Sequence, residues 1–163
     1  MFAPDDAFLT TILRLLRSLP AYPMFGHGRT RLQPAYADDV AAAIAEVVRQ
    51  SKKPYPIYEL AGPRVYSYEE LLRTIARSAG LRPVLMRMPF ALWNAVAGLA
   101  EILPQPPLTR NQVELMQIDT TASENRPGFR ALRISPRSLE EELEGMLKHS
   151  KTQTQRTLIP GRD

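Results

Sequence analysis

Apolar residues recur every three or four positions through most of the chain, the spacing that places them on one face of an α-helix. Most of these runs begin beside a polar residue or a proline, and several end at glycine or at a cluster of prolines, as helices do. The pattern therefore predicts helices over residues 5–18, 38–50, 67–80, 89–103, 109–116 and 135–147.

Polar side chains at the predicted helix starts can accept hydrogen bonds from the free backbone N–H groups of the first turn. Two of the starts also carry a carboxylate or amide three residues later, which completes a capping box. The predicted caps are Asp5 or Asp6, Asp38 or Asp39, Ser67 with Glu70, Thr109 with Gln112, and Ser135 before Pro136.

Short runs between turn residues predict strands between the helices. The candidates are residues 22–25, 30–36, 56–60 and 83–88, and the first two are separated by the turn Gly26-His27-Gly28. Helix outweighs strand in this pattern, and no internal repeat is visible. The predicted fold class is α/β, rich in helix and with short strands.

The composition of the 163 residues is that of a soluble chain with one core, since 44% of them are hydrophobic. The longest apolar stretch, residues 90–103, is shorter than the roughly 20 residues that span a bilayer. The first residues lack the basic and apolar regions of a secretory signal, which favours a cytoplasmic location. The absence of cysteine excludes disulfides, thiolate metal sites and a cysteine nucleophile.

The net charge of +4 comes partly from residues 148–163, which carry four basic side chains and one acidic side chain. This segment is predicted to be a basic, disordered tail. A basic tail can bind nucleic acid or anionic lipid, but a solvated tail is the favoured interpretation, and no nucleic-acid partner is expected.

Neither the acid/base pair nor the cofactor loop of a nicotinamide-dependent reductase is present. A Tyr-x-x-x-Lys pair lets the lysine lower the pKa of the phenol, but no tyrosine of this chain has lysine four residues later. A dinucleotide fingerprint needs three glycines before a helix, whereas Gly26 and Gly28 are followed by Arg31 at the third position. The sequence therefore assigns no catalytic residue.

Other candidate sites have plain structural alternatives. His27 and His149 lie far apart in the sequence, so no metal site is predicted. Asp38 and Asp39 are interpreted as an N-cap and a charge that stabilises the helix dipole, in preference to a catalytic pair.

Two further features have both a functional and a structural interpretation. Arg29 and Arg31, near Tyr36, could bind phosphate or carboxylate, although a solvated loop is the simpler interpretation. The apolar helix at residues 89–103 either packs in a core or lies on a membrane or partner surface.

Three stretches occur in an order and at a spacing that resemble a known family: FAPDDAFL from residue 2, QPAYADDVA from residue 33 and YELAGP from residue 58. Residues 109–119 and 127–135 extend the likeness to about residue 147. Together they resemble the C-terminal half of extended and atypical short-chain dehydrogenase/reductases. Within these, the likeness is to the branch that contains the NAD(P)-binding accessory subunit of respiratory complex I and its bacterial relatives.

The resemblance implies that residues 1–147 form the substrate-side lobe of a Rossmann-type fold, whose NAD(P)-binding half would lie upstream of Met1. The chain would then be a truncated oxidoreductase-like protein related to complex I or quinone metabolism, inactive and unable to hold NAD(P) alone. Whether the full-length relative is an enzyme stays open. The alternative is a non-catalytic binding or assembly module for a membrane or respiratory complex, located in the cytoplasm, at a membrane surface, or in the mitochondrial matrix of a eukaryote.

The same resemblance places a substrate cleft on a set of residues near the missing half, namely Phe2, Pro4, Arg29, Arg31, Gln33 and Tyr36. Two departures from the family bear on this cleft. Ala3 replaces the glycine of the Phe-Gly-Pro turn, which is expected to alter the cleft edge. Leu32 and Gln33 replace an arginine–acid pair of nucleotide-sugar epimerases, which disfavours a sugar-nucleotide substrate.

Overall fold

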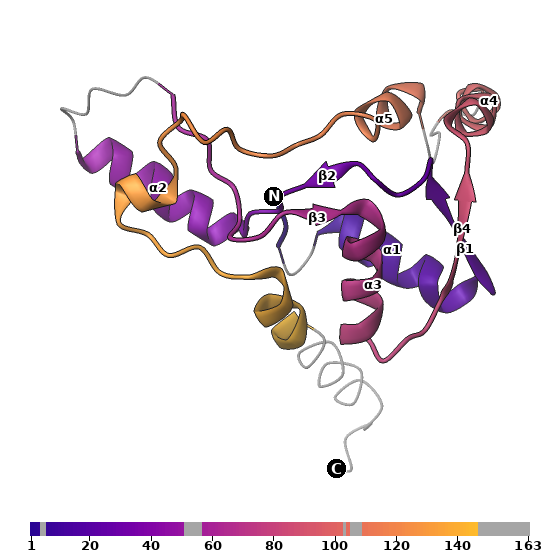
Figure 1. Cartoon of the computed structure of the whole chain (residues 1–163), viewed down its shortest axis with the longest axis horizontal. Helices are drawn as coiled ribbons and strands as arrows, with labels where there is room; N and C mark the ends of the chain where they lie inside the picture. Colours follow the sequence, from indigo (N-terminus) through magenta and orange to yellow (C-terminus); the bar gives the residue numbers. More distant parts are fainter. Residues whose placement is uncertain (4–5, 51–56, 103, 105–108, 147–163) are drawn as a thin grey trace, which may run out of the picture.

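The computed structural model describes residues 1–3, 6–50, 57–102, 104 and 109–146. Its elements are α1 (Ala7–Ser18), β1 (Ala21–Phe25), β2 (Arg31–Leu32), α2 (Ala37–Arg49), β3 (Tyr66–Ser67), α3 (Tyr68–Ser78), β4 (Val84–Met88), α4 (Phe90–Ala100), α5 (Arg110–Leu115) and the 3-10 turn η1 (Phe129–Leu132), shown in Figure 1. Residues 139–146 are also helical. The predicted α/β class, with more helix than strand, is confirmed; the predicted tail at 148–163 lies outside the described residues.

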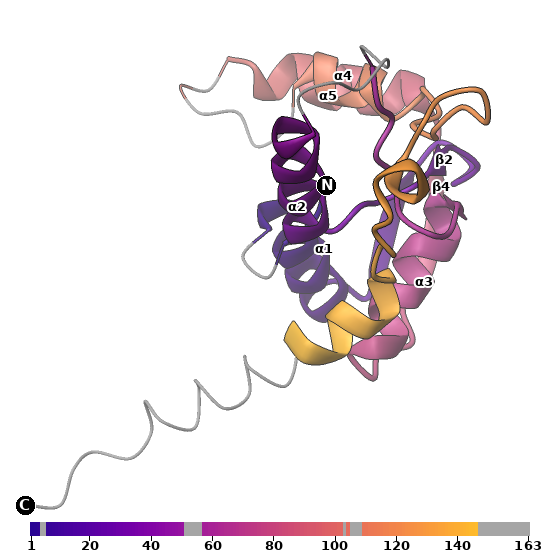
Figure 2. The same cartoon turned by 90° about the vertical axis from the view of Figure 1, so that its left-hand side faces the viewer.

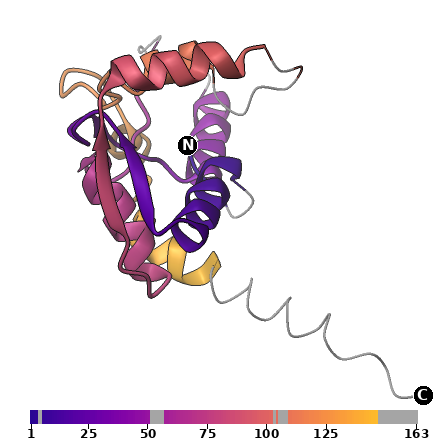
Figure 3. The same ribbon diagram turned by 90° about the vertical axis from the view of Figure 1, so that its right-hand side faces the viewer.

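The strands form two small sheets. β1 pairs with β4 in parallel, from Ala21 opposite Val84 to Phe25 opposite Met88. β2 pairs with β3 in antiparallel register, and an isolated parallel bridge joins Phe2 to Tyr36. Figure 3 shows β1 and β4 side by side along one edge of the molecule. α4 and α5 lie together at one end, opposite the helix at 139–146 (Figure 2).

Several predicted helix caps are confirmed. The Asp6 carboxylate accepts a hydrogen bond from the Leu9 backbone N–H at 2.9 Å. Both predicted capping boxes are formed, Ser67 with Glu70 and Thr109 with Gln112. Hydrogen bonds from the Ser67 backbone and hydroxyl lower the pKa of the Glu70 carboxyl, as expected for a carboxylate used as a cap.

Two other predicted caps are wrong. Tyr36 is the N-cap of α2 and makes no side-chain cap bond, while Asp38 and Asp39 lie in the first turn. The last helix is capped by Ser138 in place of Ser135, because Ser138 and Glu141 exchange hydrogen bonds of 3.0 and 3.3 Å. Ser138 has Glu141 three residues later and completes a capping box, whereas Ser135 has a serine at that position.

The predicted strand at 56–60 is not formed by its described residues, 57–60. A strand needs a neighbouring chain to complete its hydrogen-bond ladder. Here the Glu59 N–H donates to the Pro127 carbonyl at 3.0 Å, and residues 57–60 join none of the described sheets. The sequence pattern of a strand is therefore present without a partner to pair with.

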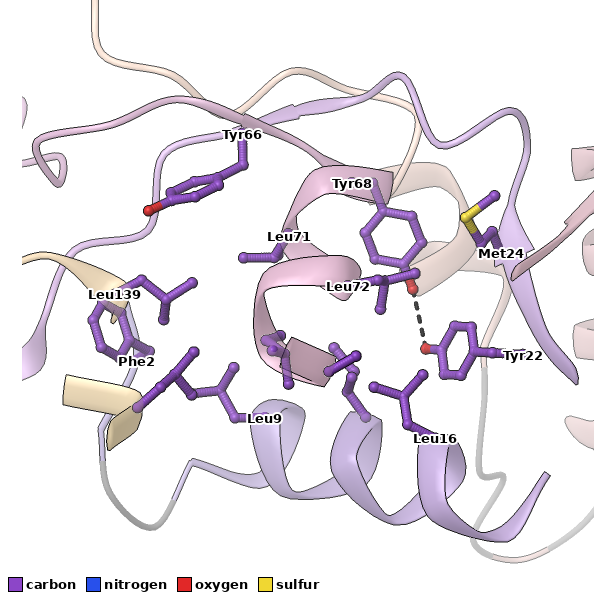
Figure 4. Packing of buried hydrophobic residues seen from close by; sticks show 14 of the residues in the cluster. Phe2, Leu9, Leu16, Tyr22, Met24, Tyr66, Tyr68, Leu71, Leu72 and Leu139 are labelled. Atoms are coloured by element: carbon purple, nitrogen blue, oxygen red, sulfur yellow. Dashed lines mark hydrogen bonds between the residues drawn. The ribbon is translucent and has the colours of Figure 1, made fainter. Parts of the chain in front are cut away.

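The main core lies between α1, β1, α3 and the helix at 139–146 (Figure 4). Leu72 and Ile75 of α3 are fully buried there. The hydroxyl groups of Tyr22 and Tyr68 are 3.1 Å apart and satisfy each other within this core. Burial raises the pKa of the Tyr68 phenol, so this pair remains neutral at physiological pH.

A second, smaller core joins α2 to η1. Its fully buried members are Ala35, Ala43, Phe129 and Leu132. None of the described helices combines the length and the apolar composition needed to cross a bilayer.

Candidate functional site

Phe2 and Tyr36 are brought together by backbone pairing. The Phe2 N–H donates to Ala35 at 2.9 Å, and the Phe2 carbonyl accepts from Ala37 at 2.8 Å. Their rings meet at a centroid distance of 5.3 Å, and both side chains are buried. The two aromatic residues therefore join the N-terminal residues, before α1, to the start of α2.

Gln33 joins two loops through its side-chain amide. Its Nε2 donates to the Gly62 carbonyl at 2.8 Å, and its Oε1 accepts from the Ala122 N–H at 3.0 Å. Both ends of the amide are thus engaged by backbone groups. A ligand that bound this side chain would have to replace one of these bonds.

Arg29 and Arg31 lie on the surface, in and just after the glycine turn. The backbone of Arg31 is fixed, because its N–H donates to Asp119 at 2.8 Å and its carbonyl accepts from Thr120 at 2.8 Å. Neither guanidinium forms an ion pair within the described part of the chain. Both are therefore open to an anion, whereas Pro4, the remaining predicted cleft residue, lies outside the described residues. The predicted cleft stays a prediction.

We expect the double change Arg29→Ala and Arg31→Ala to alter the free energy of unfolding by no more than about 0.5 kcal/mol, because exposed side chains without partners contribute little. Thermal and urea unfolding of the two proteins measure this difference. Arg137→Ala provides the comparison, since it removes the ion pairs described next. A double variant as unstable as Arg137→Ala would show that Arg29 and Arg31 have a structural role.

A cluster around Arg137 was not foreseen from the sequence. The Arg137 Nε donates to Asp39 Oδ1 at 2.9 Å, and its backbone N–H donates to Asp39 Oδ2 at 2.7 Å. The guanidinium also lies over the Tyr36 ring, 4.1 Å from the centroid, and pairs with Glu142 at 3.2 Å. These contacts fix the start of α2 to the segment before the last helix.

The electrostatics of this cluster favour a structural role. Hydrogen bonding to Asp39 raises the pKa of the Arg137 guanidinium, so the ion pair is complete at any physiological pH. Burial raises the pKa of the Tyr36 phenol, so the phenol stays protonated near neutrality. Asp39 and Arg137 are 98 positions apart, and no local pattern in the sequence connects them.

A cavity of about 810 Å³ opens between α2 and the η1 region. Its lining consists of Ala42, Glu46, Arg49, Gln50, Ala131, Leu132, Arg133 and Ile134. None of the predicted cleft residues that the structure describes lines it. The cavity and the predicted cleft are therefore separate regions.

Comparison with solved structures shows the class of fold. The NADPH-dependent quinone oxidoreductase QOR2 of Escherichia coli, solved with NADPH, matches at a TM-score of 0.65 and 16% identity, over 86% of this chain and 50% of its own. A nucleoside-diphosphate-sugar epimerase of Staphylococcus aureus matches at 0.58 and 14% identity, over 85% of this chain and 48% of its own. The chain has the fold of part of a Rossmann-type, short-chain dehydrogenase/reductase-like protein.

Comparison with curated sequences shows a likeness to one particular subunit of respiratory complex I. The mitochondrial NADH dehydrogenase [ubiquinone] 1 alpha subcomplex subunit 9 of Arabidopsis thaliana is 27% identical over 150 residues. The match covers 86% of this chain and 37% of that protein, so the chain spans well under half of its curated relative. No protein-family model matches the chain. The predicted resemblance, including the likeness to a complex I subunit, is confirmed.

Proposed function

We propose that this chain is the C-terminal, substrate-side lobe of an NAD(P)-binding oxidoreductase-like protein related to the complex I accessory subunit or to quinone metabolism. The observation that carries the proposal is the coverage: most of this chain superposes on about half of proteins solved with NADPH or NADP. The NAD(P)-binding half would be its partner. A cytoplasmic location, or the mitochondrial matrix in a eukaryote, goes with this proposal.

The described residues do not fit a dinucleotide by themselves. Gly26 and Gly28 have φ of +56° and +70°, as tight turns require. The space beside them is already filled, since a Cβ on Gly26 would meet the Phe90 ring and one on Gly28 would meet Glu69. The turn leads into β2, whereas a pyrophosphate site needs a helix N-terminus. This turn therefore does not provide a pyrophosphate site for NAD(P).

The lobe would contribute substrate contacts through its open arginines. Arg29 and Arg31 carry positive charge next to a glycine turn, which suits an anionic or quinone-like headgroup. Removing both should weaken binding of such a ligand to the full-length protein by about 1.5–3 kcal/mol for each charged hydrogen bond lost. Gln33 would fix the backbone two residues after Arg31, since its amide is engaged within the lobe, where Tyr36 is buried.

We expect this chain alone to bind NADPH and NADH with a Kd no tighter than about 1 mM, equivalent to roughly −4 kcal/mol. The reason is that, among the described residues, no glycine-rich turn joins a strand to an α-helix. Isothermal titration calorimetry measures the affinity, and the Escherichia coli quinone oxidoreductase serves as the positive control. Micromolar binding would contradict the proposal that the cofactor is held by another part of the protein.

The genomic DNA immediately upstream of the first codon provides the direct test of the proposed function. An in-frame glycine-rich turn together with Tyr-x-x-x-Lys would support an oxidoreductase of which this is one lobe. A glycine-rich turn without that pair would indicate a cofactor-binding scaffold. An in-frame reading that contains neither would contradict the proposal.

One observation favours a second candidate function, a non-catalytic binding or assembly module at a membrane or respiratory complex. Helix α4 exposes Leu92, Val96 and Leu99, although only Asn94 interrupts its apolar sequence. A helix that is hydrophobic on every side is normally covered. Its exposed side therefore suits a binding surface.

A further inference from the structure

The outward side of α4 is a continuous aliphatic stripe. Leu92, Val96 and Leu99 are spaced by four and three residues, so they share one face of the helix. Leu92 is 51% exposed and Leu99 is 71% exposed. Ile102, one turn further along the chain, is also exposed.

Contacts on the inward side of α4 prevent the helix from rotating about its axis to bury the stripe. The Trp93 indole Nε1 donates to the Met24 carbonyl at 3.1 Å, and its ring lies 4.4 Å from that of Phe25. Ala97 is fully buried. These contacts fix the rotation of α4 against β1, so its aliphatic stripe stays exposed.

The neighbouring helix α5 extends the apolar character of this end of the molecule. α5 packs beside α4, and exposed Leu115 and Ile118 lie at its end.

The kind of side chain in the stripe indicates the kind of partner. The residues that dominate binding between proteins are enriched in tryptophan, tyrosine and arginine, whereas leucine and valine are under-represented. The tryptophan of α4 is partly buried and turned towards β1, and the large side chains that α4 exposes are aliphatic. Helices that bind along a bilayer surface bury just such an apolar face at the boundary between headgroups and acyl chains. With 11 residues, α4 would lie along the bilayer, since spanning one takes about 20.

Arginines stand at both ends of the stripe. Arg87 lies three residues before α4 and is exposed, with its nearest carboxylate, Glu69, 4.0 Å away. Arg110, at the start of α5, is exposed and lies against Gly98 of α4, with Glu101 3.6 Å from it. No charged residue occurs within α4 itself. An apolar stripe between cations is complementary to a bilayer that contains anionic lipid.

We propose that α4 binds the surface of an anionic bilayer, with Leu92, Val96 and Leu99 in the acyl boundary and Arg87 and Arg110 at the lipid phosphates. The proposal rests on the second candidate function and specifies its partner. It does not depend on nucleotide binding. Tight NADPH binding by this chain would contradict the proposed function, whereas failure to bind vesicles would contradict only the membrane proposal.

The test is flotation of the full chain with phosphatidylcholine vesicles, either pure or with about 30% phosphatidylglycerol to supply negative charge. We expect binding to the mixed vesicles, and at least a tenfold lower partition coefficient for Leu92→Ser with Leu99→Ser. Both side chains are exposed, so the variant should keep the unfolding midpoint of the wild type. The matched control is Ile44→Ser with Val48→Ser on α2, which removes two aliphatic side chains that are 57% and 72% exposed. It should bind as the wild type does.

Fluorescence of the single tryptophan assigns the binding to α4. Trp93 is the only tryptophan of the chain and lies in this helix, so brominated lipid should quench it on binding. Changing Arg87 and Arg110 to alanine should weaken binding to mixed vesicles at low salt.

Four results would overturn the proposal. The first is a wild type that fails to bind the mixed vesicles, and the second is a control variant that loses as much binding as the α4 variant. The third is binding that survives the α4 changes but disappears when residues 148–163 are removed, which would assign it to the basic tail. The fourth is a dimer in solution that the α4 changes dissociate, which would make a second copy the partner.

Discussion

Replacing Gly62 by alanine should lower the free energy of unfolding by about 2–3 kcal/mol, the upper part of the range for overpacking a close contact. A Cβ at this position would overlap the Pro34 carbonyl oxygen. Because that oxygen belongs to the backbone, it cannot rotate away as a flexible side chain would. The shift would also disturb the hydrogen bond from Gln33 Nε2 to the Gly62 carbonyl. For a chain of this size the midpoint of thermal unfolding should fall by about 5–10 °C.

Gly145→Ala is the matched control for this change. Gly145 lies in the helix at 139–146, and no heavy atom stands within 4 Å of where its Cβ would be. Alanine should therefore stabilise the helix by up to about 1 kcal/mol. If the two alanine variants lose stability equally, the close approach of Gly62 to Pro34 is not what makes glycine necessary there.

The second large effect is expected for Asp39→Ala, which leaves the Arg137 guanidinium without its main partner. Removing one member of a buried ion pair costs about 3–5 kcal/mol. Because the Arg137 side chain is 42% exposed, water can replace part of the interaction, and we expect about 2 kcal/mol. Urea unfolding monitored by circular dichroism measures the loss.

Asp38→Ala tests whether this effect belongs to the pair or to the start of α2 in general. Asp38 also lies in the first turn of α2, but it is exposed and 3.9 Å from Arg137. Its removal should cost no more than about 0.5 kcal/mol. Equal losses in the two variants would mean that the charge in the first helical turn, and not the contact with Arg137, stabilises the protein.

Local rules were sufficient to predict the helices and several of their caps, because a cap and its helix lie within a few residues of each other. The segment 57–60 shows where such rules fail. Its composition is that of a strand, but strand formation depends on a neighbour that the local sequence does not specify. For the last helix the local rule was applied to the wrong serine, since Ser138, with Glu141 three residues later, forms the capping box.

The candidate site was less predictable than the fold. Arg29 and Arg31 were identified from residue type, and their exposure is consistent with a binding role without showing one. Gln33 and Tyr36 gain their contacts from segments far away in sequence, so their burial could not be foreseen. For α4, the sequence allowed both a core and a surface interpretation; the contact of Trp93 with Met24 decides which face is exposed.

The parallel pairing of β1 with β4 has a consequence for the order of folding. The paired residues, such as Ala21 and Val84, lie roughly 60 positions apart, so the two strands can meet only after a long loop closes. Contacts of such large sequence separation slow folding. α1 and α3 are separated by a similar length of chain, so we expect their shared core and the β1–β4 pair to form together, late in folding. Since α4 follows β4 directly, its aliphatic stripe takes its final orientation only in this late step, and a newly made chain passes through a stage in which the stripe is free to associate with other chains.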